Sequence, residues 1–228
     1  MKEQILPTIK KYIGIACESP YSRYKSWDNC RLAFSTTEQH AYHKLELAFF
    51  LASWGMYRGS SGLLQRNHLV HQGAVDLLYA TPSLKCTESQ GVTEADIDEI
   101  MELKKRLCEY YQSIPDTDGR KISPTDTLIS KIMLGTHSCI PAYDQFFING
   151  LQIQNEYKKH AFFNRESLVK LFAFAKEYEE EIASCQHYVK QKINTYYPVM
   201  KIVDMFFWQT GYDKLLALTE ACKKETNI

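Results

Sequence analysis

The chain has 228 residues, of which 27 are Lys or Arg and 27 are Asp or Glu, so its formal net charge is zero. With 45% hydrophobic residues it can bury one sizeable core, and its overall field does not steer it towards nucleic acid or an anionic membrane. A local basic patch is compatible with this balance.

The 7 cysteines are an odd number and show no CxxC spacing. Residues 1–11 contain no long apolar stretch, and the longest apolar run, 47–54, is too short to span a bilayer. We therefore expect a reduced, cytoplasmic protein without a disulfide framework, a structural metal or a cofactor.

Helical patterns dominate the first quarter of the chain. Residues 3–17 predict an amphipathic helix, and the aromatic and basic segment after it contains Tyr24 and Trp27. Such a segment suits either stacking on bases or covering the edge of a core. Thr36 and Gln39 then match a capping box and predict a helix that is apolar on nearly all sides near its end, as a central buried helix would be.

A Gly/Ser turn that contains Arg58, Ser60 and Ser61 follows that helix and leads into the next, expected over about 61–79. Backbone N–H groups in such a turn, beside a guanidinium, favour a phosphate or a carboxylate. The Gly-Lys-Ser/Thr ending of a P-loop is absent. The alternative is a tight connection between helices with Arg58 paired to an internal acid.

The turn-forming run 114–122 separates two predicted helices. Thr93 and Asp96 are expected to cap the first, and the second is expected to begin at Ser123 and to contain Lys131. If the chain divides into two helical halves, this turn is the expected boundary.

Pro141 is expected to open a further helix with Asp144 in its first turn, where the helix dipole and free N–H groups favour a carboxylate. A polar loop with Lys158 and Lys159 follows. Asn164 is then expected to cap one long helix that continues to about residue 193.

The last apolar helix is expected to begin near Pro198 and to end at Gly211, and it contains Asp204. A carboxylate among apolar neighbours needs a partner, either Lys201 three residues away or a basic side chain from elsewhere, such as Arg58 or Lys131. No segment alternates as a strand does. We therefore predict an all-α fold of about eight to ten helices over residues 1–228, packed as one unit or two halves around a buried central helix.

Histidine and cysteine patterns give little support for other chemistry. The two HxxH pairs, at 40–43 and 68–71, lack the HExxH pattern and a third ligand, so no metal site is expected. His137 and Cys139 share a loop, but buried free cysteines are usually inert.

Residues 128–147 contain a helix, a loop and the sequence Ile-Pro-Ala-Tyr-Asp144 before an aromatic helix. This stretch resembles the region of helix-hairpin-helix DNA glycosylases in which a catalytic Asp lies at a helix start. The resemblance implies that Asp144 helps to expel a damaged base, which aromatic side chains stack in a cleft between two helical halves. The chain departs from the family in its motifs: KISPTDT, at 121–127, replaces the Leu-Pro-Gly-Val-Gly hairpin, and Lys131 lies inside a helix instead of at the hairpin position of the lysine of bifunctional members. It also has no iron-sulfur cysteine cluster, and it is not basic.

Two hypotheses follow. The first is a nucleic-acid-acting protein, for which we assign the candidate residues by role: catalytic Asp144, Asp204 and Lys131, phosphate-binding Arg58, Ser60, Ser61, Lys158 and Lys159, and stacking Tyr24, Trp27 and Tyr143. The second is a non-enzymatic helical binding module in which the acids and bases only fix the core. A protein partner or a second copy of the chain is compatible with both.

Overall fold

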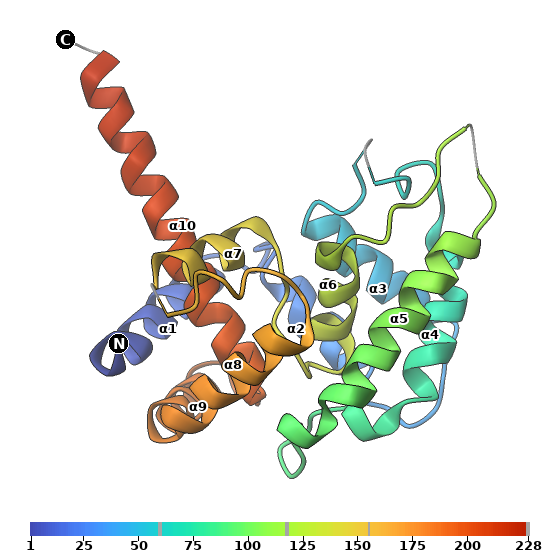
Figure 1. Cartoon of the computed structure of the whole chain (residues 1–228), viewed down its shortest axis with the longest axis horizontal. Helices are drawn as coiled ribbons and strands as arrows, with labels where there is room; N and C mark the ends of the chain where they lie inside the picture. The colour runs from blue at the N-terminus through green and yellow to red at the C-terminus, as the bar shows by residue number, and fades with distance from the viewer. Residues whose placement is uncertain (59–60, 117–118, 155, 227–228) are drawn as a thin grey trace.

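The computed structural model describes residues 1–58, 61–116, 119–154 and 156–226, with side chains of the last helix described up to residue 220. This part of the chain contains ten α-helices, three short 3-10 helices and no β-strand, which confirms the predicted all-α fold (Figure 1). The α-helices are α1 (Lys2–Cys17), α2 (Lys25–Ala33), α3 (Tyr42–Ser53), α4 (Gln72–Tyr79), α5 (Ile97–Ser113), α6 (Asp126–Thr136), α7 (Gln145–Ile153), α8 (Arg165–Glu177), α9 (Glu179–Ile193) and α10 (Val199–Thr226). The 3-10 helices are η1 (His68–His71), η2 (Pro82–Leu84) and η3 (Glu94–Asp96).

The α-helices form two groups. In the middle group, α2 to α6 pack on one another, and the loop over 114–122 joins α5 to α6 within it. In the terminal group, α7 to α10 pack together with α1, which lies against α9 and α10 although it comes first in the chain (Figure 1). The two groups meet where α5 contacts α8 and around the loop from α6 to α7.

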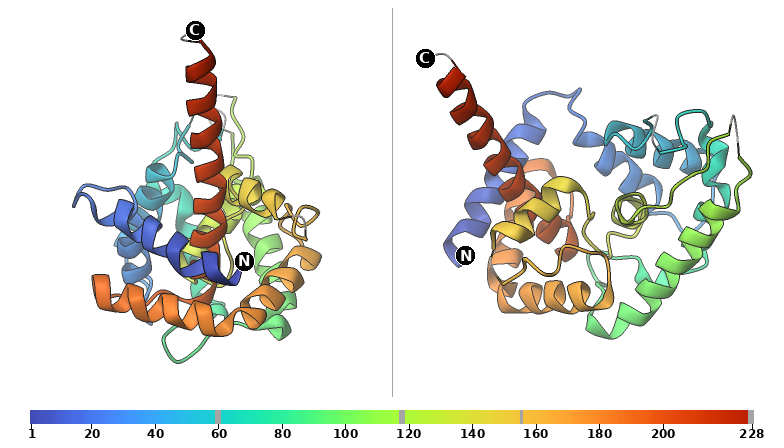
Figure 2. Two further views of the ribbon diagram at one scale, coloured as in Figure 1. Left: turned by 90° about the vertical axis from the view of Figure 1, so that its left-hand side faces the viewer. Right: turned by 45° about the horizontal axis from the view of Figure 1, so that its top comes forward.

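Helix α7 crosses α10 at very close range because a glycine lies on each side of the contact. A Cβ on Gly150 would lie 1.9 Å from the backbone oxygen of Phe207, and a Cβ on Gly211 would lie 2.0 Å from that of Phe146. No side chain fits there. Gly211 therefore serves the crossing instead of ending the helix as the sequence had suggested, and α10 continues to Thr226, past the rest of the body (Figure 2).

The helix starts confirm some expected caps and correct others. Asn164 caps α8 through a 2.9 Å bond from the N–H of Ser167. The prediction of Ser123 as a cap is wrong, since Thr125 accepts the bond from Leu128 and α6 begins three residues later than Ser123. The expected helix over 165–193 is in fact two helices that meet at residue 178.

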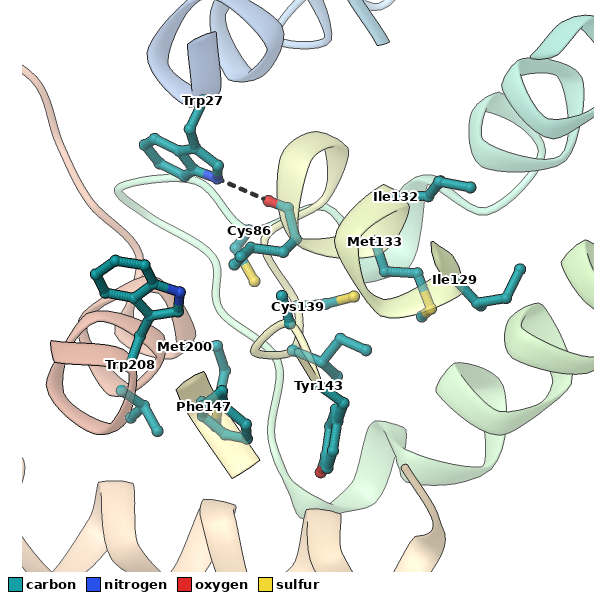
Figure 3. Close-up of a cluster of buried hydrophobic side chains, with 14 of the residues drawn as sticks. Trp27, Cys86, Ile129, Ile132, Met133, Cys139, Tyr143, Phe147, Met200 and Trp208 are labelled. Atoms are coloured by element: carbon teal, nitrogen blue, oxygen red, sulfur yellow. Dashed lines mark hydrogen bonds between the residues drawn. The ribbon is translucent and has the colours of Figure 1, made fainter. Parts of the chain in front are cut away.

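The central buried helix is not the one expected. Phe49 and Leu45 on α3 are 55% and 54% exposed, so part of this apolar helix lies at the surface, as apolar side chains often do. By contrast, residues 128–136 of α6 and 200–209 of α10 are almost entirely buried. Figure 3 shows the core around α6, where the indole N–H of Trp27 donates to the Leu134 carbonyl at 3.0 Å.

None of the helices in the described ranges combines the length and the apolar character that crossing a bilayer requires.

Candidate functional site

Lys131 and Asp144 form an ion pair where the two groups of helices meet. The Lys131 Nζ lies 2.6 Å from Oδ2 of Asp144, and their side chains are 4% and 13% exposed. The other carboxylate oxygen accepts bonds of 3.1 Å from the N–H groups of Phe146 and Phe147, so Asp144 is the N-cap of α7. The indole N–H of Trp208 donates to Oδ2 at 3.3 Å. Both oxygens of Asp144 are therefore held in place.

This geometry corrects the predicted start of α7. Pro141 lies in the loop before the helix, and Asp144 precedes the first helical residue instead of lying in the first turn. The side chain of an Asp accepts bonds from free N–H groups at a helix start, which a proline ring cannot do. The cap lies three residues after the proline, and the helix therefore starts at Gln145, one residue later.

A second pair, Lys201 and Asp204, lies behind the first. Their Nζ and Oδ2 atoms are 3.0 Å apart and the side chains are only 3% and 5% exposed. The ammonium group lies over the rings of Tyr12 and Trp27, at 5.4 and 5.0 Å from their centroids. Asp204 thus takes the local partner that the sequence offered, and the more distant candidates Arg58 and Lys131 do not pair with it.

Both pairs line one small cavity of about 10 Å³, which is about the room that one water molecule needs. Among its lining residues only Trp54 and Asp144 are partly exposed, and the others are buried. The opening therefore lies at Trp54 and Asp144, and the Lys201–Asp204 pair lies at the closed end.

Aromatic side chains surround this opening. The ring of Trp54 lies 5.5 Å from that of Tyr24 and 5.8 Å from that of Trp208, both edge to face. Two cations lie over the same ring of Trp54, Lys131 at 5.0 Å and the exposed Arg23 at 4.9 Å from the centroid. Within the described part of the chain, the buried indole nitrogen of Trp54 has no hydrogen-bond partner.

The structure thus brings together several of the residues that the sequence singled out. Asp144, Asp204, Lys131 and Trp27 line the cavity. Tyr24 lies directly beside it, through its contact with the Trp54 ring. These five residues come from α2, α6, the start of α7 and α10, so they meet only in the folded chain.

The structure corrects the expected place of Tyr143, which does not line the cavity. Its side chain is buried away from the cavity, with its ring stacked on Phe163 at 5.2 Å and its hydroxyl 2.7 Å from that of Ser167. A residue next to Asp144 in sequence points elsewhere because Asp144 has the extended backbone of an N-cap.

The predicted phosphate-binding residues also lie outside the cavity lining. Arg58, Lys158 and Lys159 are exposed, while Ser61 is buried and donates its hydroxyl to the Arg58 carbonyl at 2.8 Å. Ser60 falls outside the described residues.

Sequence reasoning missed Trp54, Trp208 and Tyr12. Trp208 had a signal, because it comes four residues after Asp204 and so shares its helix face. Trp54 directly follows α3, where helical periodicity no longer places a side chain. Tyr12 comes from α1, about 190 residues away from the pair that its ring covers, so no local pattern points to it.

The histidine pairs make hydrogen bonds within the fold. His71 is fully buried between two hydroxyls, with Nε2 2.8 Å from that of Tyr57 and Nδ1 2.6 Å from that of Tyr111. The backbone N–H of His40 donates to Nδ1 of His43 at 2.9 Å. Over the ranges that the structure covers, no three His, Cys, Asp or Glu side chains gather as metal ligands would.

The His137–Cys139 pattern does not form a nucleophilic pair. The Nε2 of His137 lies 3.0 Å from the backbone oxygen of Thr81, so this nitrogen donates to the main chain. Cys139 is fully buried, and burial raises the pKa of its thiol well above the usual value. A thiol of this kind packs and does not react.

No protein-family model, curated protein or solved structure matches this chain. The cavity combines a lysine amine in contact with a carboxylate and, beside them, a partly exposed indole.

Proposed function

We propose that this protein acts on nucleic acid, with Lys131 and Asp144 as the reacting pair and Trp54 at the opening through which a base or a sugar enters. The contact of 2.6 Å between the Lys131 amine and the one partly exposed carboxylate of the cavity carries the proposal. Enzymes that act on a base take it out of the double helix, and aromatic side chains stabilise the extruded base by stacking on it. The aromatic rings around the opening support this role.

The proposed step is attack on the sugar carbon that has lost its base. The Lys131 nitrogen forms a bond to the aldehyde carbon of an abasic sugar, the carbonyl oxygen leaves as water, and Asp144 accepts the proton that the amine gives up. The product is an imine between protein and sugar. Asp204 has a positioning role in this scheme, because it lies at the closed end of the cavity and holds the Ala142 N–H.

Entry of a substrate requires movement at the opening, since the cavity has room for about one water molecule. Trp54 is well placed for this. It directly follows α3, and Gly55 after it has a φ of 73°, a conformation that glycine adopts without cost. Trp54 is therefore the lining residue whose movement we propose, since it lies outside the helical residues of α3.

Reductive trapping tests the proposal. The protein is mixed with an oligonucleotide that contains one abasic site, and sodium borohydride is added to reduce the imine to a stable amine. We expect a covalent complex on a denaturing gel from the native chain. We expect none from Lys131→Arg, which keeps a positive charge beside Asp144 but has no amine to form the imine.

Lys104→Arg is the matched control, because Lys104 also pairs with an aspartate, Asp126, at 2.7 Å, but outside the cavity. It should give the complex in full. Binding to the same oligonucleotide should also weaken steeply as salt rises from about 50 to 200 mM. Absence of a complex from the native chain, or its persistence in Lys131→Arg, contradicts the proposal.

The small volume of the cavity favours a second candidate, a binding module in which both Lys–Asp pairs only fix the core. For this candidate, Asp144→Asn lowers the melting temperature and leaves every nucleic-acid measurement unchanged.

A further inference from the structure

A second, larger cavity of about 380 Å³ lies between the end of α2, the end of α4 and the loop 82–90. It shares no lining residue with the cavity between the Lys–Asp pairs. Its volume falls within the range of small-molecule sites, about 300 to 1,000 Å³.

The walls of this cavity suit a flat ring. Phe34 and Tyr79 line it with ring centroids 5.9 Å apart and an angle of 32° between the ring planes. Leu78 and Pro82 add apolar surface. A planar aromatic body can pack against these rings.

A smaller hollow of about 300 Å³ adjoins the cavity. Ser35, Lys85 and Thr87 line both spaces, and Arg31 lines the smaller one. A ligand can therefore have its body in the larger space and a polar head in the smaller one. Lys85 and two hydroxyl groups lie where the spaces meet, and Arg31 lies in the smaller space.

Arg31 and Lys85 each have N–H donors that make no hydrogen bond within the described part of the chain. Arg31 donates from Nη2 to the Cys86 carbonyl, while its buried Nη1 has no hydrogen-bond partner in the part of the chain that is described. Lys85 donates to the Thr36 carbonyl at 2.8 Å, which uses one of its three N–H donors. Neither side chain makes an ion pair with the described acids.

Their surroundings disfavour this uncompensated charge. Burial lowers the pKa of Arg31, and the pKa of Lys85 falls through burial and then through the positive charge of Arg31. A bound anion would offset both effects.

The acids nearby are already engaged. Asp28 and Glu88 line the smaller hollow, but Asp28 accepts a bond of 2.7 Å from the Tyr197 hydroxyl, and Glu88 pairs with Lys190. Both acids therefore have partners of their own, and neither forms an ion pair with Arg31 or Lys85.

We propose that Arg31 and Lys85 bind the phosphate of a small aromatic phosphate monoester, such as a nucleoside monophosphate, whose ring packs against Phe34 and Tyr79. Two unpaired cations match the charge of a phosphate dianion, and a guanidinium can bind two of its oxygens at once. The Thr87 hydroxyl can donate to a remaining oxygen, whereas the Ser35 hydroxyl already donates to the Leu32 carbonyl at 2.7 Å.

Calorimetric titration of the full chain with adenosine monophosphate tests this site. Adenosine, inorganic phosphate and benzoate are the comparison ligands, and each contains only part of the proposed recognition. We expect the monophosphate to bind at least about tenfold more tightly than any of them, because only it fills both spaces.

Two variants probe the phosphate contact. Lys85→Gln removes one charge from a half-buried side chain, and Ser35→Asp adds a negative charge from an exposed one, so at least one variant should keep the fold. Each should weaken binding of the monophosphate by at least about tenfold. Lys105→Gln, on an exposed side chain elsewhere, is the control and should bind as the native chain does.

Several outcomes would overturn the assignment: no binding of the monophosphate, equal binding of adenosine or benzoate, full binding by folded Lys85→Gln or Ser35→Asp, or tighter binding of a single-stranded oligonucleotide than of the monophosphate. Lys131→Arg should leave this binding intact, since the two cavities share no lining residue. The outcome is therefore independent of whether Lys131 reacts with abasic DNA.

Discussion

Asp204 on α10 accepts a hydrogen bond of 3.0 Å from the backbone N–H of Ala142, two residues before Asp144. The buried pair on α10 therefore fixes the loop that carries the partly exposed carboxylate. The same carboxylate balances Lys201 through its other oxygen. A substitution of Asp204 should thus change both the stability of the fold and the position of Asp144.

Asp204→Asn should destabilise the protein strongly. The amide can still accept from Ala142, but Lys201 is left as a buried cation without a counter-charge, which costs about 3–5 kcal/mol. Urea unfolding followed by circular dichroism measures the loss. Glu109→Gln, in the exposed pair with Lys105, is the control and should change stability by at most about 0.5 kcal/mol. Equal unfolding midpoints for the two variants would contradict this account of the pair.

Gly150→Ala and Gly211→Ala should each destabilise by more than about 3 kcal/mol, because the new methyl group would overlap a backbone oxygen at the α7–α10 crossing. Gly14→Ala is the matched control in α1, where nothing lies within 4 Å of the added carbon. It should stabilise by about 0.5–1 kcal/mol. Thermal melts of the three variants test this, and a mild effect at either crossing position would show that the helices can separate.

The buried imidazole of His71 should make the protein less stable in acid. Burial, and then the positive charge of His68, lower the pKa of His71 to about 3, against about 6.5 in an unfolded chain. Between these values the unfolded state binds a proton that the folded state does not, so the free energy of unfolding falls as pH falls below about 6.5.

His71→Gln removes this contribution. Urea unfolding at pH 7.5 and 5.0 should show the native chain losing about 2 kcal/mol more than the variant, although the variant is weaker at both values because it loses bonds to Tyr57 and Tyr111. His187→Gln, exposed on α9, should keep the native pH dependence. Parallel pH curves for His71→Gln and the native chain would refute the assignment.

Asp144→Asn separates the two roles of this carboxylate. Asparagine caps a helix about as well as aspartate, so α7 should still begin at the same residue, while Lys131 loses its counter-charge. We expect a loss of about 2–4 kcal/mol in urea unfolding and, under the proposed function, no trapped complex. Asp144→Ala should cost about 1 kcal/mol more, because it also removes the cap. If Asp144→Ala and Asp144→Asn are equally stable, the cap contributes nothing.

The sequence predicted the local relationships among the central residues better than the long-range ones. The Lys201–Asp204 pair followed from a spacing of three on one helix, which is a local relationship. The contact between Lys131 and Asp144 depends on how the loop 137–143 returns the chain to α6, and no periodic pattern encodes that path. The fixed φ of Pro141 predicts a helix start there, but the side chain of Asp144 provides the cap.

Arg31 and Lys85 show the same limit more clearly. They are 54 positions apart, on a helix and in a loop, and each looks like an ordinary surface residue in its own segment. Their lack of an acidic partner is a property of the tertiary packing of side chains. Likewise, the sequence of α3 does not predict that one of its faces is exposed, because an apolar run does not show whether another element covers it.

The packing of α1 against α9 and α10 has a consequence for how the protein is made. A ribosome delivers α1 before α9 and α10, so the surfaces that cover its apolar side emerge only when residues 179–226 are made. Helices α2 to α6 contact one another and are close in sequence, so they can assemble before the helices that cover α1 have been made. The N-terminal segment should therefore be among the last to gain protection in a pulse-labelled hydrogen-exchange experiment on nascent or refolding chains.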